Sequence, residues 1–396
     1  MSACGGSAIG GKNKIIFLIL IGIILITTGA SCSGCGTKKD GGVYRSDDRA
    51  QNWTQKSFIE QVKKKVTTMG SSTVLSLELD PTDANIIYAG TKGQGIFISK
   101  NGGEDWDSTA QKTGNIYSIN VDAHDANIIF ATNDYSIIKS VDQGATWEVV
   151  HTDSKKKNFT KVIVDTFDHN KIYAASLSGI VYKSMDQGNN WEIKLQLEDD
   201  GIKNIFMRPD TRILYALTES GNVLKTITGG EIEGSITTPN EVKFKKQENP
   251  VNKAWATIFT AEHNKKWPTA KNAFNFFIFK NYPNIVFMST RHGLLKSIDD
   301  ANTWVEVPTL IPLEDADNEK INNLIVDPID SNYIYFTIIN SNKIYKSSDA
   351  GDNWQFIENF PSTRYVNTMI IDPETPTTLY IGMLIPEEKK GLIKSK

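Results

Sequence analysis

The sequence predicts an all-β fold, a seven-bladed β-propeller with four-stranded antiparallel blades. Three observations favour this fold. An eight-residue motif recurs with most successive tryptophans 41 to 53 residues apart, alternating apolar runs precede each copy, and the repeats show no helical period. Self-similarity on this scale is typical of propellers and solenoids. Four strands of about four to eight residues per repeat form the blade of a propeller.

The motif reads Ser-x-Asp/Asn-x-Gly/Ala-x-x-Trp, and it contains six of the eight tryptophans. Its six copies are Ser46-Asp48-Ala50-Trp53, Ser99-Asn101-Gly103-Trp106, Ser140-Asp142-Gly144-Trp147, Ser184-Asp186-Gly188-Trp191, Ser297-Asp299-Ala301-Trp304 and Ser347-Asp349-Gly351-Trp354. A degenerate seventh copy, Thr226-Thr228-Gly230, lacks its tryptophan.

The residue types of the motif suit a tight turn between the third and fourth strands of a blade. Asp, Asn and Ser side chains bond to nearby backbone groups, and glycine adopts a positive φ at little cost. Ala50 and Ala301 replace that glycine, so we expect their turns to be strained or differently shaped. The tryptophan is expected to fill space between blades. The copies resemble the Asp-box, or bacterial neuraminidase repeat, and we interpret their carboxylates as structural rather than catalytic.

The two ends of the chain are expected to close the ring as a single domain, 41–396. Segment 41–53 supplies a turn and an outer strand with no inner strands before it, and the C-terminal segment supplies the missing inner strands. Segments 41–46 and 391–396 both align with the third strand of this blade, which leaves its occupant open. The first strands of the seven blades are predicted to begin near Val74, Ile116, Phe159, Ile202, Ala273, Ile321 and Tyr365.

Loop lengths distinguish the two faces of the predicted ring. Turns between strands one and two lie on the face of the eight-residue motifs and are short, whereas the loops of the opposite face vary, so that face is the candidate binding surface. An insertion at 231–272 is assigned to it, with Trp255 and Trp267 outside any motif. We interpret it as a recognition flap with aromatic anchors or as an insertion packed on its own blade. Arg291 and His292 are placed at the mouth of the channel.

Composition restricts the chemistry of the chain. Its 43 Lys+Arg against 46 Asp+Glu give a net charge of −3, which argues against a nucleic-acid partner. A hydrophobic content of 39% suits a large core. The three cysteines all lie in the first 35 residues, so the remaining chain forms no internal disulfide, cysteine-bound metal site or thiol nucleophile. We expect no metal and no cofactor.

The N-terminal segment is predicted to be an export signal. The apolar run 15–26 follows Lys12 and Lys14, and it is too short for a typical membrane span. The small residues before Cys32 resemble the end of a bacterial lipoprotein signal. The resemblance implies a signal peptide at 1–31, acylation of Cys32, a tether at 32–40 and attachment to the outer face of the cytoplasmic membrane or to the cell envelope. Acylation of Cys35 and an uncleaved anchor are the alternatives.

Sialidases also carry Asp-boxes, and they need an arginine triad that holds the substrate carboxylate. This chain has six arginines, and four of them, Arg45, Arg49, Arg208 and Arg212, fall on the turn face or the rim. No P-loop, dinucleotide fingerprint or serine nucleophile elbow is present. The repeats also resemble the photosystem II stability/assembly factor family, which is seven-bladed, and the sortilin N-terminal domain, which has ten blades.

These observations predict a membrane-anchored extracytoplasmic propeller, monomeric and not an enzyme. It is expected to bind a protein or peptide of the cell envelope or to scaffold an assembly, with the lipid bilayer contacted through the acylated cysteine. The alternative is a glycan-binding or glycoside-hydrolysing propeller of the sialidase type.

Overall fold

The computed structural model describes residues 39–386 apart from 63–64, 209–210, 212, 231–253, 260, 271, 280, 309–319 and 359. The predicted signal peptide, Cys32, Cys35, Arg212 and segment 391–396 therefore lie outside the described residues. Lys39–Lys396 form one compact unit. No helix among the described residues has the length and apolar character needed to span a bilayer.

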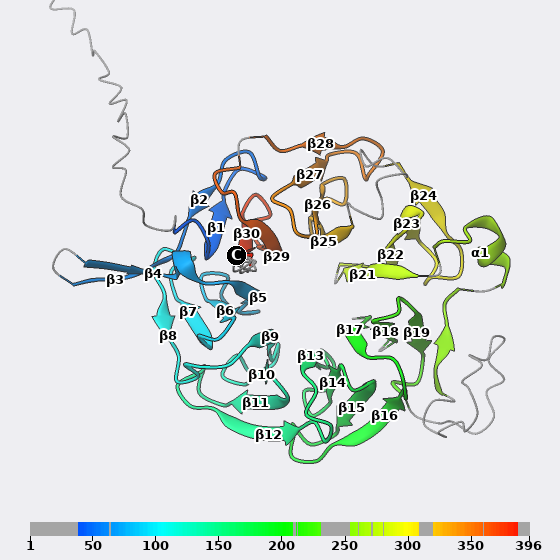
Figure 1. The fold of residues 1–396 in the computed structure, drawn as a ribbon, viewed down its shortest axis with the longest axis horizontal. Coiled ribbons are helices and arrows are strands. Elements are labelled where there is room, and N and C mark those ends of the chain that lie inside the picture. Colours follow the sequence, from blue (N-terminus) through cyan, green and yellow to red (C-terminus); the bar gives the residue numbers. More distant parts are fainter. Residues whose placement is uncertain are drawn as a thin grey trace, which may run out of the picture. The chain divides into compact units, whose positions relative to one another are not determined.

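Seven four-stranded antiparallel sheets are arranged around a ring, which confirms the predicted fold (Figure 1). Blades I to III are β5 (Val74–Leu79), β6 (Ile87–Thr91), β7 (Ile96–Ser99), β8 (Asp107–Ser108); β9 (Ile116–Val121), β10 (Ile129–Asn133), β11 (Ser136–Ser140), β12 (Glu148–Thr152); and β13 (Phe159–Val164), β14 (Ile172–Ser176), β15 (Ile180–Ser184), β16 (Glu192–Gln196).

Blades IV to VI are β17 (Ile202–Met207), β18 (Leu214–Thr218), β19 (Val223–Thr226), β20 (Ala256–Thr257); β21 (Ala273–Phe279), β22 (Tyr282–Thr290), β23 (Gly293–Ser297), β24 (Val305–Val307); and β25 (Ile321–Val326), β26 (Ile334–Ile338), β27 (Ile344–Ser347), β28 (Gln355–Phe356). Blade VII combines β29 (Tyr365–Ile371) and β30 (Leu379–Leu384) with β1 (Val43–Ser46) and β2 (Thr54–Gln55). A hairpin, β3 (Phe58–Val62) and β4 (Lys65–Thr68), a 3₁₀ turn (Met69–Ser71) and helix α1 (Ala261–Lys266) lie outside the blades.

The ring closes through the predicted pairing of the two chain ends. Strand β1 runs antiparallel to β30, with Val43 opposite Gly382 and Ser46 opposite Leu379. Segment 41–46 therefore supplies the third strand of blade VII, which the sequence left open. All seven inner strands begin at the predicted residues.

The eight-residue turns share one hydrogen-bond pattern. In the turn of blade II, Ser140 Oγ accepts the Gly144 N–H at 2.8 Å and donates to Asp142 Oδ1 at 2.8 Å. Asp142 in turn accepts the backbone N–H and the hydroxyl of Thr146, at 2.8 and 2.6 Å. Ala50 and Ala301 keep the same bond to the motif serine, at 3.0 and 2.9 Å, with φ of 69° and 64°. Their turns are thus strained in backbone conformation but not different in shape.

The motif tryptophans differ in burial, although the sequence treats them alike. Trp106 is 1% exposed, and its indole N–H donates to the carbonyl of Lys56 in the preceding blade, at 2.9 Å. Trp354 makes the corresponding bond to Pro308. Trp147 instead bonds to Gly144 of its own turn and is only partly buried. The space between blades is thus filled mainly by the tryptophans that reach the preceding blade.

A β-bulge lies near the start of the inner strand in every blade, where the pairing with the second strand shifts by one residue. A bulge re-aims side chains out of the regular alternation. Side chains at these starts bond to a backbone carbonyl of the next inner strand, and together the bonds form a closed belt. Its links are Ser76→Ile116, Ser118→Val162, Thr160→Ile202, Lys203→Phe274, Asn275→Asn322, Asn322→Asn367 and Asn367→Val74.

A second set of contacts joins neighbouring blades near the eight-residue turns. Lys346 Nζ donates to the carbonyl of Arg49 in the next blade at 3.1 Å and lies 5.9 Å from the ring centre of Tyr335 in its own blade. Lys225 and Arg45 repeat this arrangement across other blade junctions. Each cation thereby contacts both a carbonyl of the next blade and an aromatic ring of its own blade, and Arg45 and Lys225 also lie near a carboxylate, that of Asp47 and that of Asp300.

We predict that Trp106→Ala lowers the free energy of unfolding by about 3–5 kcal/mol, because it leaves a cavity and an unpaired carbonyl between blades. Trp147→Ala, the matched control, costs about 1–2 kcal/mol because that side chain is already partly exposed. Urea unfolding followed by fluorescence measures both. Equal losses for the two variants would contradict this assignment.

Stability is also predicted to fall in acid. Hydrogen bonds from Thr146 lower the pKa of Asp142, and bonds from Asn190 and Asn353 do the same for Asp186 and Asp349. A lowered folded-state pKa stabilises the protein above the unfolded value of about 3.9, and this contribution is lost as pH falls through the folded pKa.

The check is the melting temperature between about pH 6 and pH 2.5. Asp142→Asn combined with Asp349→Asn is expected to reduce the fall of the melting temperature in acid, since Asn101 fills the same position in blade I and accepts the serine hydroxyl and the Asp105 N–H without titrating. If the melting temperature of the double variant falls in acid as much as that of the unchanged protein, other groups set the acid sensitivity.

Candidate binding site

A pocket of about 320 Å³ opens on the face opposite the eight-residue turns, which we call the loop face. It lies where blades IV, V and VI meet. Its walls come from the start of β17, the loop 219–221, the start of β21, Arg291 in the β22–β23 loop and the start of β25. The candidate surface predicted from loop variation thus contains the described pocket.

Two lysines converge on Phe274 in this pocket. Lys203 Nζ donates to the Phe274 carbonyl at 2.6 Å, and Lys320 Nζ lies 4.4 Å from the centre of the Phe274 ring. Desolvation lowers the pKa of Lys203, and the charge of Lys320 lowers it further. The ammonium groups of these two lysines repel each other, so an anion between them would be stabilised.

The remaining polar lining strengthens the positive character of the pocket. Arg291 adds a third cation, and Glu219 is the one carboxylate among the described lining residues. Neutral donors and acceptors are present as well, namely Ser220, Asn272, Asn275 and Asn322. A cationic pocket in a chain of net charge −3 is suited to an anionic ligand.

Lys203 occupies the pocket because of its place in the belt. The corresponding links of blades I to III use hydroxyls, Ser76, Ser118 and Thr160, which reach only a close neighbouring strand. At the junction of blades IV and V a longer side chain makes the link, and the pocket opens beside it. Comparing the starts of the seven inner strands could have singled out Lys203, but the sequence analysis did not make that comparison.

Trp255 corrects two sequence-based predictions. It is 2% exposed, and its indole N–H donates to Lys194 in the preceding blade at 2.8 Å, as Trp106 does to Lys56. It directly precedes the outer strand β20, and Gly230 N–H still bonds to the Thr226 hydroxyl. Trp255 is therefore the tryptophan of the degenerate seventh motif.

The sequence-based prediction accordingly assigned too long a segment, 231–272, to the loop face. Gly230 and Trp255 both belong to a turn of the opposite face, and residues 231–253 between them lie outside the described part. Only 258–272 belongs to a loop-face connection. The prediction failed because a long gap separates two halves of one motif.

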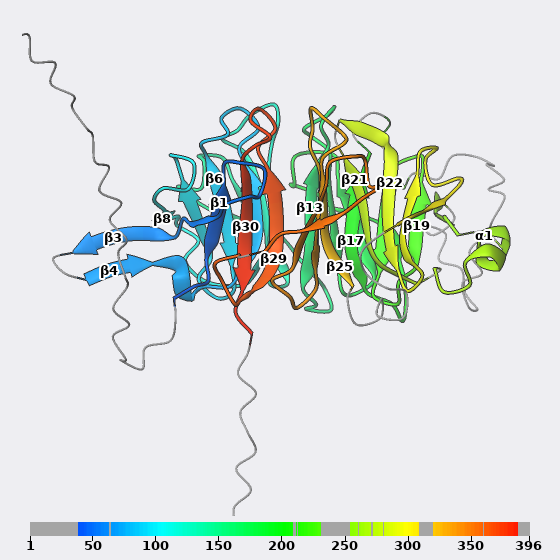
Figure 2. The same ribbon diagram turned by 90° about the horizontal axis from the view of Figure 1, so that it is seen from above.

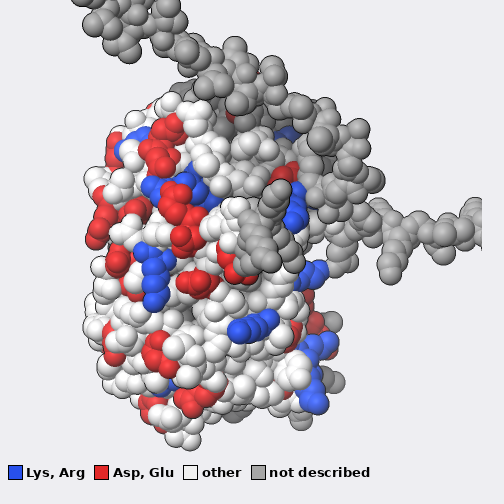
Figure 3. Space-filling model, turned by 90° about the vertical axis from the view of Figure 1, so that its left-hand side faces the viewer, with Lys and Arg blue, Asp and Glu red and all other residues white. Residues whose placement is uncertain are grey.

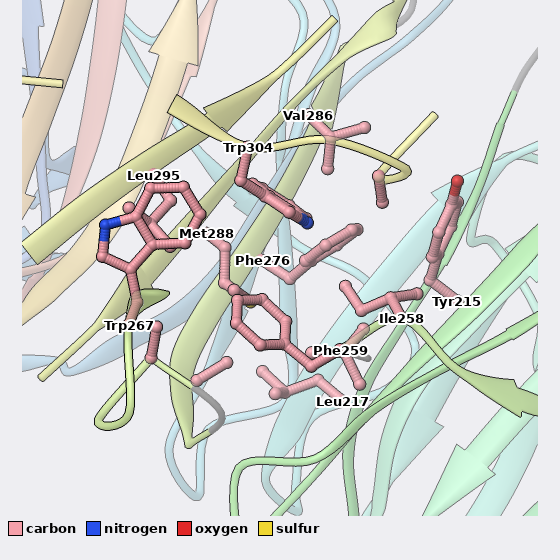
Figure 4. Packing of buried hydrophobic residues seen from close by; sticks show 14 of the residues in the cluster. Tyr215, Leu217, Ile258, Phe259, Trp267, Phe276, Val286, Met288, Leu295 and Trp304 are labelled. Atoms are coloured by element: carbon pink, nitrogen blue, oxygen red, sulfur yellow. The ribbon is translucent and has the colours of Figure 1, made fainter. Parts of the chain in front are cut away.

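Trp267 and His292 also lie away from the pocket. Trp267 is 4% exposed and packs in a cluster with Phe259, Met288 and Trp304 (Figure 4). His292 faces Glu306, with Nε2 and Oε2 3.4 Å apart, and its ring centre is 6.2 Å from that of Trp267. Trp255 and Trp267 are thus not exposed anchors, and packing on the blades is the interpretation that fits.

The arginines of the turn face form ion pairs between blades. Arg49 Nη1 lies 2.6 Å from Asp327 Oδ2, and Arg208 Nη1 lies 2.5 Å from Asp300 Oδ1. The two pairs occupy corresponding positions. Arg49 and Asp300 are each the fourth residue of an eight-residue turn, and Asp327 and Arg208 each follow the inner strand of the preceding blade, so the charges are exchanged between the two pairs. In the described part of the chain no group of three or more His, Cys, Asp or Glu could hold a metal ion.

Comparisons with known proteins place the fold among β-propellers of several kinds. No family model matches the chain. The structure of YCF48 bound to D1 peptide aligns with a TM-score of 0.54 and 14% identity, covering 79% of this chain and 94% of YCF48. YCF48 from Cyanidioschyzon merolae aligns at 0.57 and 12%, covering 78% and 95%.

Xyloglucanases also have a similar fold. The GH74 xyloglucanase from Xanthomonas campestris aligns with a TM-score of 0.57 and 16% identity over 81% of this chain and 51% of the enzyme. A probable oligoxyloglucan-reducing end-specific xyloglucanase of Neosartorya fischeri is 34% identical over 94 residues, 24% of this chain. The match spans 11% of the length of that curated relative. The similar proteins thus include a peptide-bound propeller and glycosidases.

Proposed function

We propose that this chain is a monomeric, lipid-anchored extracytoplasmic propeller that binds an acidic segment of a partner protein in its loop-face pocket and acts as a non-catalytic scaffold. The observation that carries the proposal is the convergence of Lys203, Lys320 and Arg291 on one pocket. An extended acidic segment suits these groups, because its carboxylates pair with the cations.

Known structures support a peptide ligand for this fold. YCF48, whose structure aligns with 79% of this chain, has been seen with a D1 peptide bound. The likeness is one of fold, and the ligand of the present chain is inferred from its own charges.

The position of Asp40 fits the proposed membrane anchor at Cys32. Asp40 is held at the rim of the loop face, where its carboxylate bonds to Arg364 Nε at 2.9 Å and its carbonyl accepts the Ser362 hydroxyl at 2.9 Å. The segment that leads to Cys32 therefore leaves from the face that carries the pocket. A partner segment near the bilayer would meet the pocket directly.

Glycoside hydrolysis is the alternative, and the likeness to xyloglucanases favours it. Most glycosidases use two carboxyl groups about 5–10 Å apart across the scissile bond. The described lining of the pocket offers Glu219 alone. The binding proposal therefore accounts better for the pocket.

Fluorescence anisotropy of labelled ten-residue peptides against the full-length protein in detergent tests the proposal. An Asp/Glu-rich peptide is expected to bind, and a Lys-rich peptide of the same length is not. Lys203→Glu with Lys320→Glu should weaken acidic-peptide binding by at least about tenfold, because two charge-assisted contacts become repulsive.

The control is Lys112→Glu with Lys156→Glu, which makes the same charge change on exposed loop-face lysines outside the pocket. Equal weakening by the control pair, or binding of neither peptide, would refute the pocket proposal. Release of sugars from xyloglucan that is lost in Glu219→Gln would establish the alternative.

A further inference from the structure

We infer that the loop face of the ring lies toward an anionic membrane surface, with the opposite face turned away from it. This orientation rests on the membrane anchor of the proposed function. It also places the pocket opening toward the bilayer, so that its partner would be a segment close to the membrane.

The beginning of β1 and the end of β30 lie together at the loop face (Figure 2). Gly42 accepts the Met383 N–H at 2.9 Å, and Ile385 N–H donates to the Thr73 hydroxyl at 3.0 Å. Together with the Asp40 contacts, these bonds fix the point at which the N-terminal segment departs. The eight residues from Cys32 to Lys39 span at most about 25 Å, so an acylated Cys32 keeps this rim near the bilayer.

The face of the eight-residue turns, here called the turn face, is strongly acidic. Five of the six complete motifs carry Asp at the third position. In five of the turns between first and second strands, at 80–86, 122–128, 165–171, 327–333 and 372–378, a buried aspartate is followed by a second, more exposed acidic residue. An anionic lipid surface repels such a face.

The loop face is more basic. Exposed Lys112 and Lys155–Lys157 lie there in the connections that join blades I to III, and Lys203, Arg291 and Lys320 lie in the pocket. Acidic residues are present as well, as at 198–200, so the attraction to lipid is moderate. Figure 3, which shows one side of the ring, has Asp and Glu most densely toward the left, whereas Lys and Arg lie on both the left and the right. The charge difference between the two faces therefore favours the same orientation as the departure point of the chain.

Lysine footprinting tests the orientation. The full-length protein is reconstituted into vesicles of phosphatidylcholine with about one third phosphatidylglycerol, and flotation first establishes that it is anchored. Acetylation by a water-soluble reagent is then quantified by mass spectrometry. Relative to detergent, Lys112 and Lys156 on the loop face should react at least about fivefold more slowly, while Lys100 on the turn face keeps its rate.

Lys112→Glu and Lys100→Glu are matched variants with the same charge change on opposite faces. The first should restore part of the reactivity of Lys156, and the second should leave it unchanged. If the protein floats with the vesicles and Lys100 is protected as much as Lys112, the orientation is overturned while the anchor stands. If the protein does not float, both the anchor and the orientation fail.

Discussion

The belt of side-chain hydrogen bonds around the inner strands is the interaction on which the rest of the ring depends. After residue 35 the chain has no cysteine, so no disulfide constrains the blades. Each belt link joins one blade to the next, and the last one, Asn367 to Val74, passes from a C-terminal strand to the first complete blade. The pairing of β1 with β30 then binds both chain ends into one blade. Closure by hydrogen bonds keeps the inner polar groups satisfied and leaves no blade with an open inner edge.

The candidate site follows from a variation in this belt. Where the other links use short or amide side chains, the junction of blades IV and V uses Lys203, whose ammonium reaches the Phe274 carbonyl. A lysine here brings a charge into the ring, and Lys320 and Arg291 place two more beside it. The group that holds two blades together is thus also part of the proposed binding surface. Ligand binding and blade packing therefore share one residue.

Much of the fold was predictable because its signals are local and repeated. Apolar alternation and turn residues located all seven inner strands, from Val74 to Tyr365. The burial of Trp106 and partial exposure of Trp147 were not predictable, since both follow the same motif and differ only in what the preceding blade offers. Trp255 was misassigned because its motif is split by an insertion, and bulges that aim Lys203 and Asn367 across blade junctions leave no mark in the alternation. Of the candidate site residues, the sequence singled out Arg291 but not the two lysines beside it.

Hydrogen exchange measured by mass spectrometry on an Asn367→Val variant tests the belt most directly. Asn367 donates to the carbonyls of Val74 and Leu75, so its loss opens the belt at one junction only. The account predicts faster exchange in β29, β30, β1 and the adjoining β5, with the strands of blades II to IV unchanged. Uniformly faster exchange in all seven blades, or no change in any of them, would contradict it.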